Sequence, residues 1–348
     1  MNISAMRGLG LTKRGLLKRA IGYPAVPVVL VAALWVVSIQ MPGKSFEGPL
    51  PPLNAKQTEL GERLHAHVEM LAGRIGERNY IKLRALDSAA EYIEKTFAAL
   101  GYTTQEQQFV VDGRTLRNIE ATIPGRSRPN EIIVIGGHYD SVLGSPGADD
   151  NASGTAGVLE LARLLKGHPL DRTVRFVAFA NEEPPYFFTE DMGSRRYARA
   201  ARVRGDTIVA MISMETIGYY SDAPGSQKYP PILGWFYPDR GNFIGIVGNV
   251  GSRSLVRRVV KDFRSFASFP SAGSAAPMQI PGISWSDQWS FWKEGYEAVM
   301  ITDTAPFRNK NYHERSDRPD SLNYDHMARV VDGVALTVES LAAKPVKD

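Results

Sequence analysis

The chain has 348 residues, of which 43% are hydrophobic, with no cysteine and a formal net charge of +4. This hydrophobic fraction supports a buried core, and the absence of cysteine excludes disulfides, thiolate metal ligands and a cysteine nucleophile. The modest charge, without a patch of interleaved basic and aromatic residues, argues against a nucleic-acid partner. Any metal site must therefore be built from His, Asp and Glu.

The N-terminus has the pattern of a membrane anchor. Residues 1–22 are basic, and residues 23–42, YPAVPVVLVAALWVVSIQMP, form an uncharged apolar segment near the lower length limit of a spanning helix. No small-residue cleavage motif follows it, so we expect an uncleaved transmembrane signal anchor rather than a cleaved signal peptide. The positive-inside tendency then predicts a single-pass membrane protein with a cytoplasmic tail at 1–22 and the remainder on the extracytoplasmic (periplasmic or extracellular) side.

An ordinary buried helix is the alternative for this apolar segment. It is disfavoured because the segment is N-terminal, flanked by charge and followed by a linker at 43–54 that is rich in Pro and Gly.

The rest of the chain alternates between helical and strand patterns. Two amphipathic helices at 57–71 and 88–100 come first, and a Gly/Pro/Ser-rich stretch at 273–286 is predicted to be a long loop. We expect strands at 107–111, 117–123, 131–135, 174–180, 208–214, 243–247 and 298–302, and further helices at 157–165, 194–202, 254–266 and 324–342. This alternation predicts one three-layer α/β/α domain over 55–345 with a mixed, mainly parallel central sheet.

Three polar segments follow predicted strands. His138 and Asp140 lie in GHYDS, and the paired acids of GADDNASG and of NEE come after them. Because parallel strands present their carboxyl ends at one edge of a sheet, these side chains are candidates for a common metal site. Either Asp149 or Asp150 could be the ligand of its pair.

The six histidines differ in their prospects as ligands. His65 and His67 lie two apart on a predicted helix and face different sides, while His168 and His326 fit surface positions. His138 and His313 remain, since both follow predicted strands and can reach the carboxyl edge of one sheet.

Six motifs in this order resemble the zinc aminopeptidases of peptidase family M28: HYDS, GADDNASG, NEE, METIGY, SDQWSFWKEG and YHERSDRPDSLN. The resemblance covers about residues 57–342 and implies two zinc ions bridged by Asp150, the acid that directly precedes Asn. It implies His138 and Glu215 on one ion and Glu183 and His313 on the other.

The same resemblance makes Glu182 the general base and implies a cis peptide bond after Asp150. Asp140 suits a supporting role, because a carboxylate two residues beyond His138 can fix its imidazole. The expected activity is hydrolysis of the N-terminal peptide bond of a peptide substrate by a metal-activated water.

One position departs from the family pattern. Many members have Asp in an Asp-Met-Ile-Gly motif where this chain has Glu215, whose side chain reaches one methylene further. The expected binding of two metal ions therefore depends most on whether Glu215 can replace Asp as a ligand. A glutaminyl cyclase-like enzyme with one zinc, and an inactive membrane-tethered binding protein, are the alternatives; the Asp-Asn-x-Ser-Gly sequence favours the peptidase.

An aromatic cluster flanks Ser286 and Asp287. Trp285, Trp289 and Phe291 belong to it, together with Trp292. The helical spacing of the cluster favours core packing for most of its members over a role in a substrate pocket.

Overall fold

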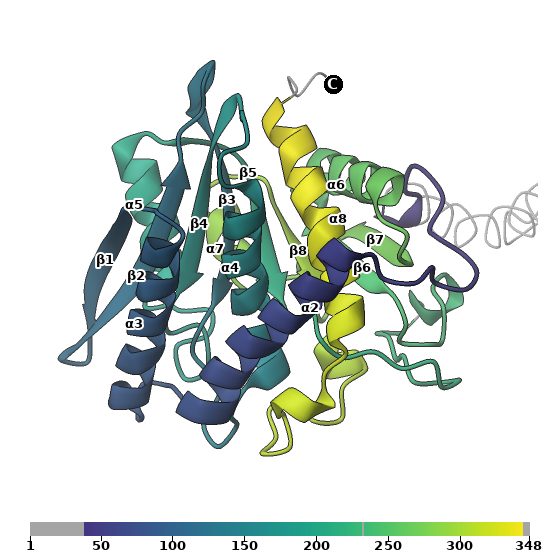
Figure 1. Cartoon of the computed structure of the whole chain (residues 1–348), viewed down its shortest axis with the longest axis horizontal. Helices are drawn as coiled ribbons and strands as arrows, with labels where there is room; N and C mark the ends of the chain where they lie inside the picture. The colour runs from purple at the N-terminus through teal and green to yellow at the C-terminus, as the bar shows by residue number, and fades with distance from the viewer. Residues whose placement is uncertain (1–37, 232, 344–348) are drawn as a thin grey trace, which may run out of the picture. The chain divides into compact units, whose positions relative to one another are not determined.

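An eight-stranded mixed sheet runs through the molecule in the order β1-β2-β4-β3-β5-β8-β6-β7 (Figure 1). The computed structural model describes residues 38–231 and 233–343, and the sheet belongs to a compact unit that begins at Met41. Its strands are β1 (Thr104–Val111), β2 (Arg114–Ile123), β3 (Arg128–His138), β4 (Arg172–Phe179), β5 (Thr207–Glu215), β6 (Ile244–Asn249), β7 (Ser271–Ala276) and β8 (Ala298–Thr302). The four central strands β4, β3, β5 and β8 are parallel to one another, as are β6 and β7, whereas β1–β2, β2–β4 and β6–β8 pair antiparallel.

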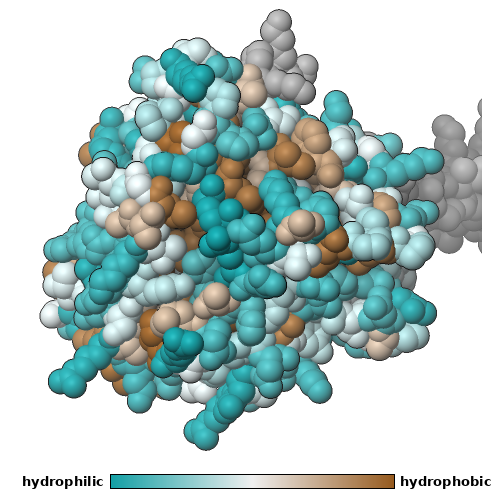
Figure 2. Space-filling model, in the orientation of Figure 1, coloured by the Kyte–Doolittle hydropathy of each residue, from teal (hydrophilic) through white to brown (hydrophobic). Residues whose placement is uncertain are grey.

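Helices cover both faces of this sheet, which confirms the predicted three layers. One face carries α2 (Ala55–Val68), α3 (Leu83–Ala99), α4 (Gly154–Leu165), α6 (Arg253–Phe266) and α8 (Tyr324–Ala343). The other carries α5 (Gly193–Arg204) and α7 (Gln288–Lys293). On the face with α2, α3, α4 and α8, hydrophilic residues cover most of the surface and hydrophobic ones form separate patches (Figure 2).

Strand β3 shows why the sheet is buried on both sides. Ile133 and Ile135 pack into the core beneath the larger helical layer, and Ile132 and Val134 pack into the core beneath α5 and α7. Because successive side chains of a strand point to opposite faces, a continuous apolar run fits a strand covered on both faces.

The predicted loop at 273–286 is wrong in its first part. Strand β7 occupies Ser271–Ala276 and forms the edge of the sheet beside β6. Its small residues carry little strand propensity, but close packing requires them: a Cβ on Gly273 would lie 2.7 Å from Met41 Cγ and 2.7 Å from Val260 Cγ2. The residue types of this segment thus indicated a loop, but tertiary packing makes it a strand.

Most of the predicted anchor lies outside the described residues. The structure does not describe residues 1–37, and among those that it does describe no helix is long and apolar enough to cross a membrane. The segment 43–54 contains neither helix nor strand, as expected of a linker, but it is attached to the body. Arg264 of α6 donates to the carbonyl oxygens of Pro42 and Gly43, and Arg329 of α8 donates to that of Pro51.

Candidate metal centre

Four neighbouring parallel strands bring the predicted site residues to one edge of the sheet. His138 is the last residue of β3 and Glu215 the last of β5, while Glu182 and Glu183 follow the end of β4. His313 lies in the loop after β8. The site therefore occupies the carboxyl ends of β4, β3, β5 and β8, where open α/β sheets bind ligands.

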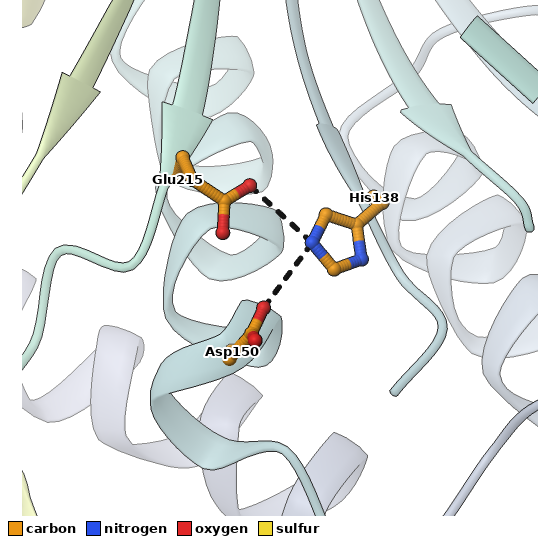
Figure 3. Close-up of side chains that lie close together, drawn as sticks. All are labelled: His138, Asp150 and Glu215. Carbon is orange, nitrogen blue, oxygen red and sulfur yellow. Dashed lines mark ion pairs between the residues drawn. The ribbon is translucent and has the colours of Figure 1, made fainter. Parts of the chain in front are cut away.

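His138, Asp150 and Glu215 form the first potential metal-binding group (Figure 3). His138 Nε2 lies 3.3 Å from Asp150 Oδ1 and 3.3 Å from Glu215 Oε2. All three residues are buried, and one ligand atom from each lies within 4.8 Å of the others. We call this set the strand-built half of the site, because His138 and Glu215 end strands.

Asp150, Glu183 and His313 form the second group, the loop-built half. His313 Nε2 lies 3.0 Å from Asp150 Oδ2 and 3.5 Å from Glu183 Oε2. Asp150 therefore directs one carboxylate oxygen at each histidine. This is the arrangement required of a carboxylate that bridges two cations.

The charge balance of the site fits two divalent cations. Burial raises the pKa of Glu182, Glu183 and Glu215, and nearby carboxylates raise them further. Burial opposes the charged form of His138, but the carboxylates of Glu215 and Glu182 outweigh it and raise its pKa. Glu183 Oε1 is buried without a hydrogen-bond partner. Bound cations would supply both the positive charge and the missing partner.

The structure distinguishes the two acids of the Asp149–Asp150 pair. The Asp149 carboxylate turns away from the histidines and accepts hydrogen bonds from Gly218 N (2.9 Å) and Asn309 Nδ2 (2.8 Å). Only Asp150 lies between His138 and His313. The peptide bond between Asp150 and Asn151 is cis, as the family resemblance implies.

Asp140 holds the acidic loop that follows β4. Its two carboxylate oxygens accept hydrogen bonds from the backbone N–H groups of Glu182 and Glu183, each at 3.1 Å. Asp140 Oδ1 also lies 3.4 Å from His138 Nδ1. This carboxylate thus contacts a candidate ligand and positions two neighbouring acids at once.

Glu215 is accommodated in spite of its additional methylene. Ser286 donates to Glu215 Oε2 at 2.6 Å, and Asn151 donates to the same oxygen at 3.2 Å. These two donors hold the longer side chain so that it still reaches His138. Sequence reasoning assigned no role to Ser286, although it lies in one of the motifs that carry the resemblance.

Arg78 is a second residue that sequence reasoning missed. Its fully buried guanidinium donates to the carbonyl oxygens of Tyr139 (2.6 Å), Pro146 (2.5 Å) and Gly147 (2.9 Å). It therefore joins the end of β3 to the loop that leads to Asp150. Burial lowers its pKa to about 10, which leaves it charged at neutral pH. No local signal marks this role, because all three partners are backbone atoms about 60 to 70 residues away.

Asp317 supports the same loop from the opposite direction. Its carboxylate oxygens accept hydrogen bonds from the backbone N–H groups of Asp149 (2.9 Å) and Asp150 (3.1 Å). Burial raises the pKa of Asp317 to about 8. The loop with the candidate bridging carboxylate is thus fixed by Arg78 on its carbonyl groups and by Asp317 on its N–H groups.

An apolar pocket adjoins the strand-built half. Glu215 and Tyr312 lie at its border with the site, and Trp285 and Phe307 line it with their rings stacked at 13°. Tyr312 also stacks on His313 with ring centroids 3.9 Å apart. In the aromatic cluster of the sequence, Phe291 is fully buried as expected, whereas Trp285 is a pocket residue.

The fold and the site together define a class of protein: a three-layer α/β protein with a buried two-centre carboxylate and histidine site at the carboxyl edge of its sheet. Residues 118–338 match the model of Peptidase family M28. The chain belongs to this family, as its motifs indicated, and it is a metallopeptidase.

Relatives and solved structures agree with the family. The uncharacterized protein YfbL of Escherichia coli is 42% identical over 282 residues, which cover 78% of this chain and 86% of YfbL. Leucine aminopeptidase 1 of Pyrenophora teres is 25% identical and covers 92% of this chain and 75% of its own. BSAP, a zinc aminopeptidase from Bacillus subtilis, shares the fold with a TM-score of 0.64 at 15% identity, over 83% of this chain and 96% of its own.

Proposed function

We propose that this chain is a membrane-anchored zinc aminopeptidase with two metal ions. The observation that carries the proposal is the shared Asp150, whose two oxygens lie 3.3 Å and 3.0 Å from the imidazoles of two separate groups of ligands. Zinc fits these groups because imidazole nitrogens and carboxylate oxygens are among its usual protein ligands. When bound, zinc supplies Lewis acidity for the scissile carbonyl and for the attacking water.

Glu182 is the general base of this proposal. It is buried, its Oε2 lies 3.9 Å from His138 Nε2, and burial raises its pKa. A carboxylate with a raised pKa can take the proton of the water and deliver it to the leaving amine. The hydrogen bonds from Glu182 N and Glu183 N to Asp140 keep the base beside the ligand while their side chains diverge.

The apolar pocket receives the side chain of the N-terminal residue. It borders Glu215 and is lined by Trp285, Phe307 and Met300 among other apolar residues. Most of this lining is apolar, and burying a charged side chain against an apolar wall is costly. We therefore infer a preference for large apolar residues at the N-terminus of the substrate.

Substitution of Glu182 by Gln tests the catalytic assignment. The variant should keep its zinc, because the two ligand groups remain, and should lose about 10²- to 10⁴-fold in turnover. The matched control is Glu183→Gln, which should lose zinc as well as activity. An active, zinc-replete Glu182→Gln enzyme would contradict the role of Glu182.

Product analysis separates the peptidase from its two alternatives. Aminoacyl and N-terminal glutaminyl substrates should yield free amino acids from protein containing two zinc ions. Ammonia release with one zinc would instead identify a glutaminyl cyclase. Absence of turnover in zinc-loaded protein would identify a binding protein.

The anchor is the remaining part of the proposal. The apolar segment 23–42 and the basic residues before it favour a single span with the catalytic unit on the extracytoplasmic side. The full-length chain should stay with membranes through an alkaline carbonate wash, and protease added from the extracytoplasmic side should reach the catalytic unit. Release by the wash would contradict the anchor.

A further inference from the structure

An uncharged segment lies on the surface near the sheet edge. Residues 229–237, YPPILGWFY, contain no charged side chain, and we call the part of them that the structure describes, 229–231 and 233–237, the aromatic loop. Trp235 is 76% exposed, and Pro231 and Gly234 are exposed beside it. Surface loops are ordinarily polar, so an exposed, uncharged run that includes Trp is a candidate contact surface.

The base of the aromatic loop is attached to the body. Leu233 is buried, Tyr237 donates its hydroxyl to Gly273 O at 2.8 Å, and Tyr229 stacks on Tyr237 with ring centroids 5.7 Å apart. Residues Leu233–Trp235 form a single 3₁₀ turn. The loop is therefore anchored through Leu233, Tyr229 and Tyr237, while Trp235 projects into solvent.

The chain enters the catalytic unit beside this base. Met41 packs against Gly273, the residue whose carbonyl oxygen binds Tyr237, and Arg264 holds the carbonyl oxygens of Pro42 (3.0 Å) and Gly43 (3.1 Å). The apolar segment 23–42 ends at Pro42 in the sequence. Because this segment continues directly into the catalytic unit beside the loop, a bilayer that holds the segment must lie close to the aromatic loop.

We propose that the aromatic loop inserts into the polar–apolar interface of the membrane, with Trp235 as its main contact. This inference rests on the proposed anchor. Trp and Tyr are enriched at membrane interfaces because their rings are apolar and their N–H and O–H groups remain polar.

The same loop connects the membrane contact to the substrate pocket. Tyr229, Leu233 and Tyr237 line the pocket that borders Glu215. One side of the loop therefore forms a pocket wall while Trp235 faces the lipid. Lipid contact would fix the position of this wall and direct the pocket toward peptides at the bilayer surface.

Quenching of tryptophan fluorescence by lipid tests the proposal. The full-length chain is reconstituted in vesicles of phosphatidylcholine and phosphatidylglycerol, with and without bromine on the acyl chains. The emission lost on substitution of Trp235 by Phe gives the contribution of Trp235 in each type of vesicle. We expect the brominated lipid to remove most of this contribution. Trp292→Phe is the matched control, since Trp292 packs beneath the sheet and should be quenched little.

Three outcomes would overturn the inference, and they are distinguishable. A chain that floats with the vesicles but whose Trp235 emission is unchanged retains its anchor and loses the lipid contact. Unchanged emission together with a doubled mass in detergent assigns the aromatic loop to a second copy of the chain. Failure of the chain to float with the vesicles would contradict both the anchor and the lipid contact.

Discussion

The two halves of the metal site are built differently, although they share Asp150. In the strand-built half, the His138 side chain is 1% exposed, and Ser286 and Asn151 both donate to Glu215. In the loop-built half, the His313 side chain is 34% exposed, and its backbone has a positive φ of 61°. The first half is positioned by the sheet, and the second by a loop that follows it.

This difference indicates unequal metal affinities. Ligands held by packing and hydrogen bonds lose little freedom on binding a cation, whereas an exposed ligand on a loop loses more. The strand-built half should therefore bind zinc more tightly. Exchange of metal should begin at the loop-built half.

Asp150→Asn should have the largest effect because it alters both halves at once. A neutral amide cannot neutralise two cations, so both zinc ions should be lost. Turnover should fall by more than about 10³-fold, the upper range for loss of one electrostatic stabiliser. Metal analysis and peptide hydrolysis check this outcome, and Asp149→Asn is the matched control that should retain zinc. Retention of two zinc ions by Asp150→Asn would refute the shared bridge.

Alanine substitutions of the two histidines should separate the halves. The His138→Ala protein should lose all of its bound zinc. Its melting temperature should also fall, because removal of a buried imidazole leaves a cavity among acidic side chains. His313→Ala should lose one zinc with a smaller change in melting temperature, since its side chain is partly exposed. Zinc content and melting temperature are the measurements. Equal losses in both variants would remove the distinction between the halves.

Arg78 should affect the loop that both halves share. Arg78→Met removes the donors to Tyr139, Pro146 and Gly147, and zinc affinity should fall about 10- to 100-fold, as for other supporting partners of metal ligands. Arg78→Lys keeps the charge and should recover part of the affinity. Zinc titration of both variants, with circular dichroism to confirm folding, checks this. Unchanged zinc affinity in folded Arg78→Met would show that the loop needs no such attachment.

The pH dependence of the metal-free protein should be the mildest effect. Burial raises the pKa of Asp287 to about 7 and that of Asp317 to about 8, well above the values of an unfolded chain. The folded state then holds more protons than the unfolded state between about pH 4 and 8, so the free energy of unfolding should fall as pH rises through this window.

Thermal unfolding from pH 5 to 8.5 measures this slope. Zinc should reduce it, because nearby cations favour the carboxylate forms. Asp287→Asn removes one of these buried acids and should make the slope near pH 7 less steep. A metal-free protein that becomes more stable toward pH 8 would contradict the raised pKa values of Asp287 and Asp317.

The sequence predicts the parts of this molecule that local patterns determine. Apolar runs predict the central strands, and the polar residues after them predict the positions of His138 and Glu183, because strand ends converge at one edge. Tertiary contacts determine the parts that were missed. Arg78 joins the site through backbone carbonyl oxygens that lie far away in the sequence, and β7 is a strand because Gly273 fits between Met41 and Val260.

A zinc titration of the metal-free enzyme tests the central claim most directly. Two zinc ions sharing Asp150 predict a stoichiometry of two, with a tighter and a weaker step, and with the weaker step abolished in His313→Ala. Saturation at one zinc ion in the unmodified chain would contradict the two-centre site.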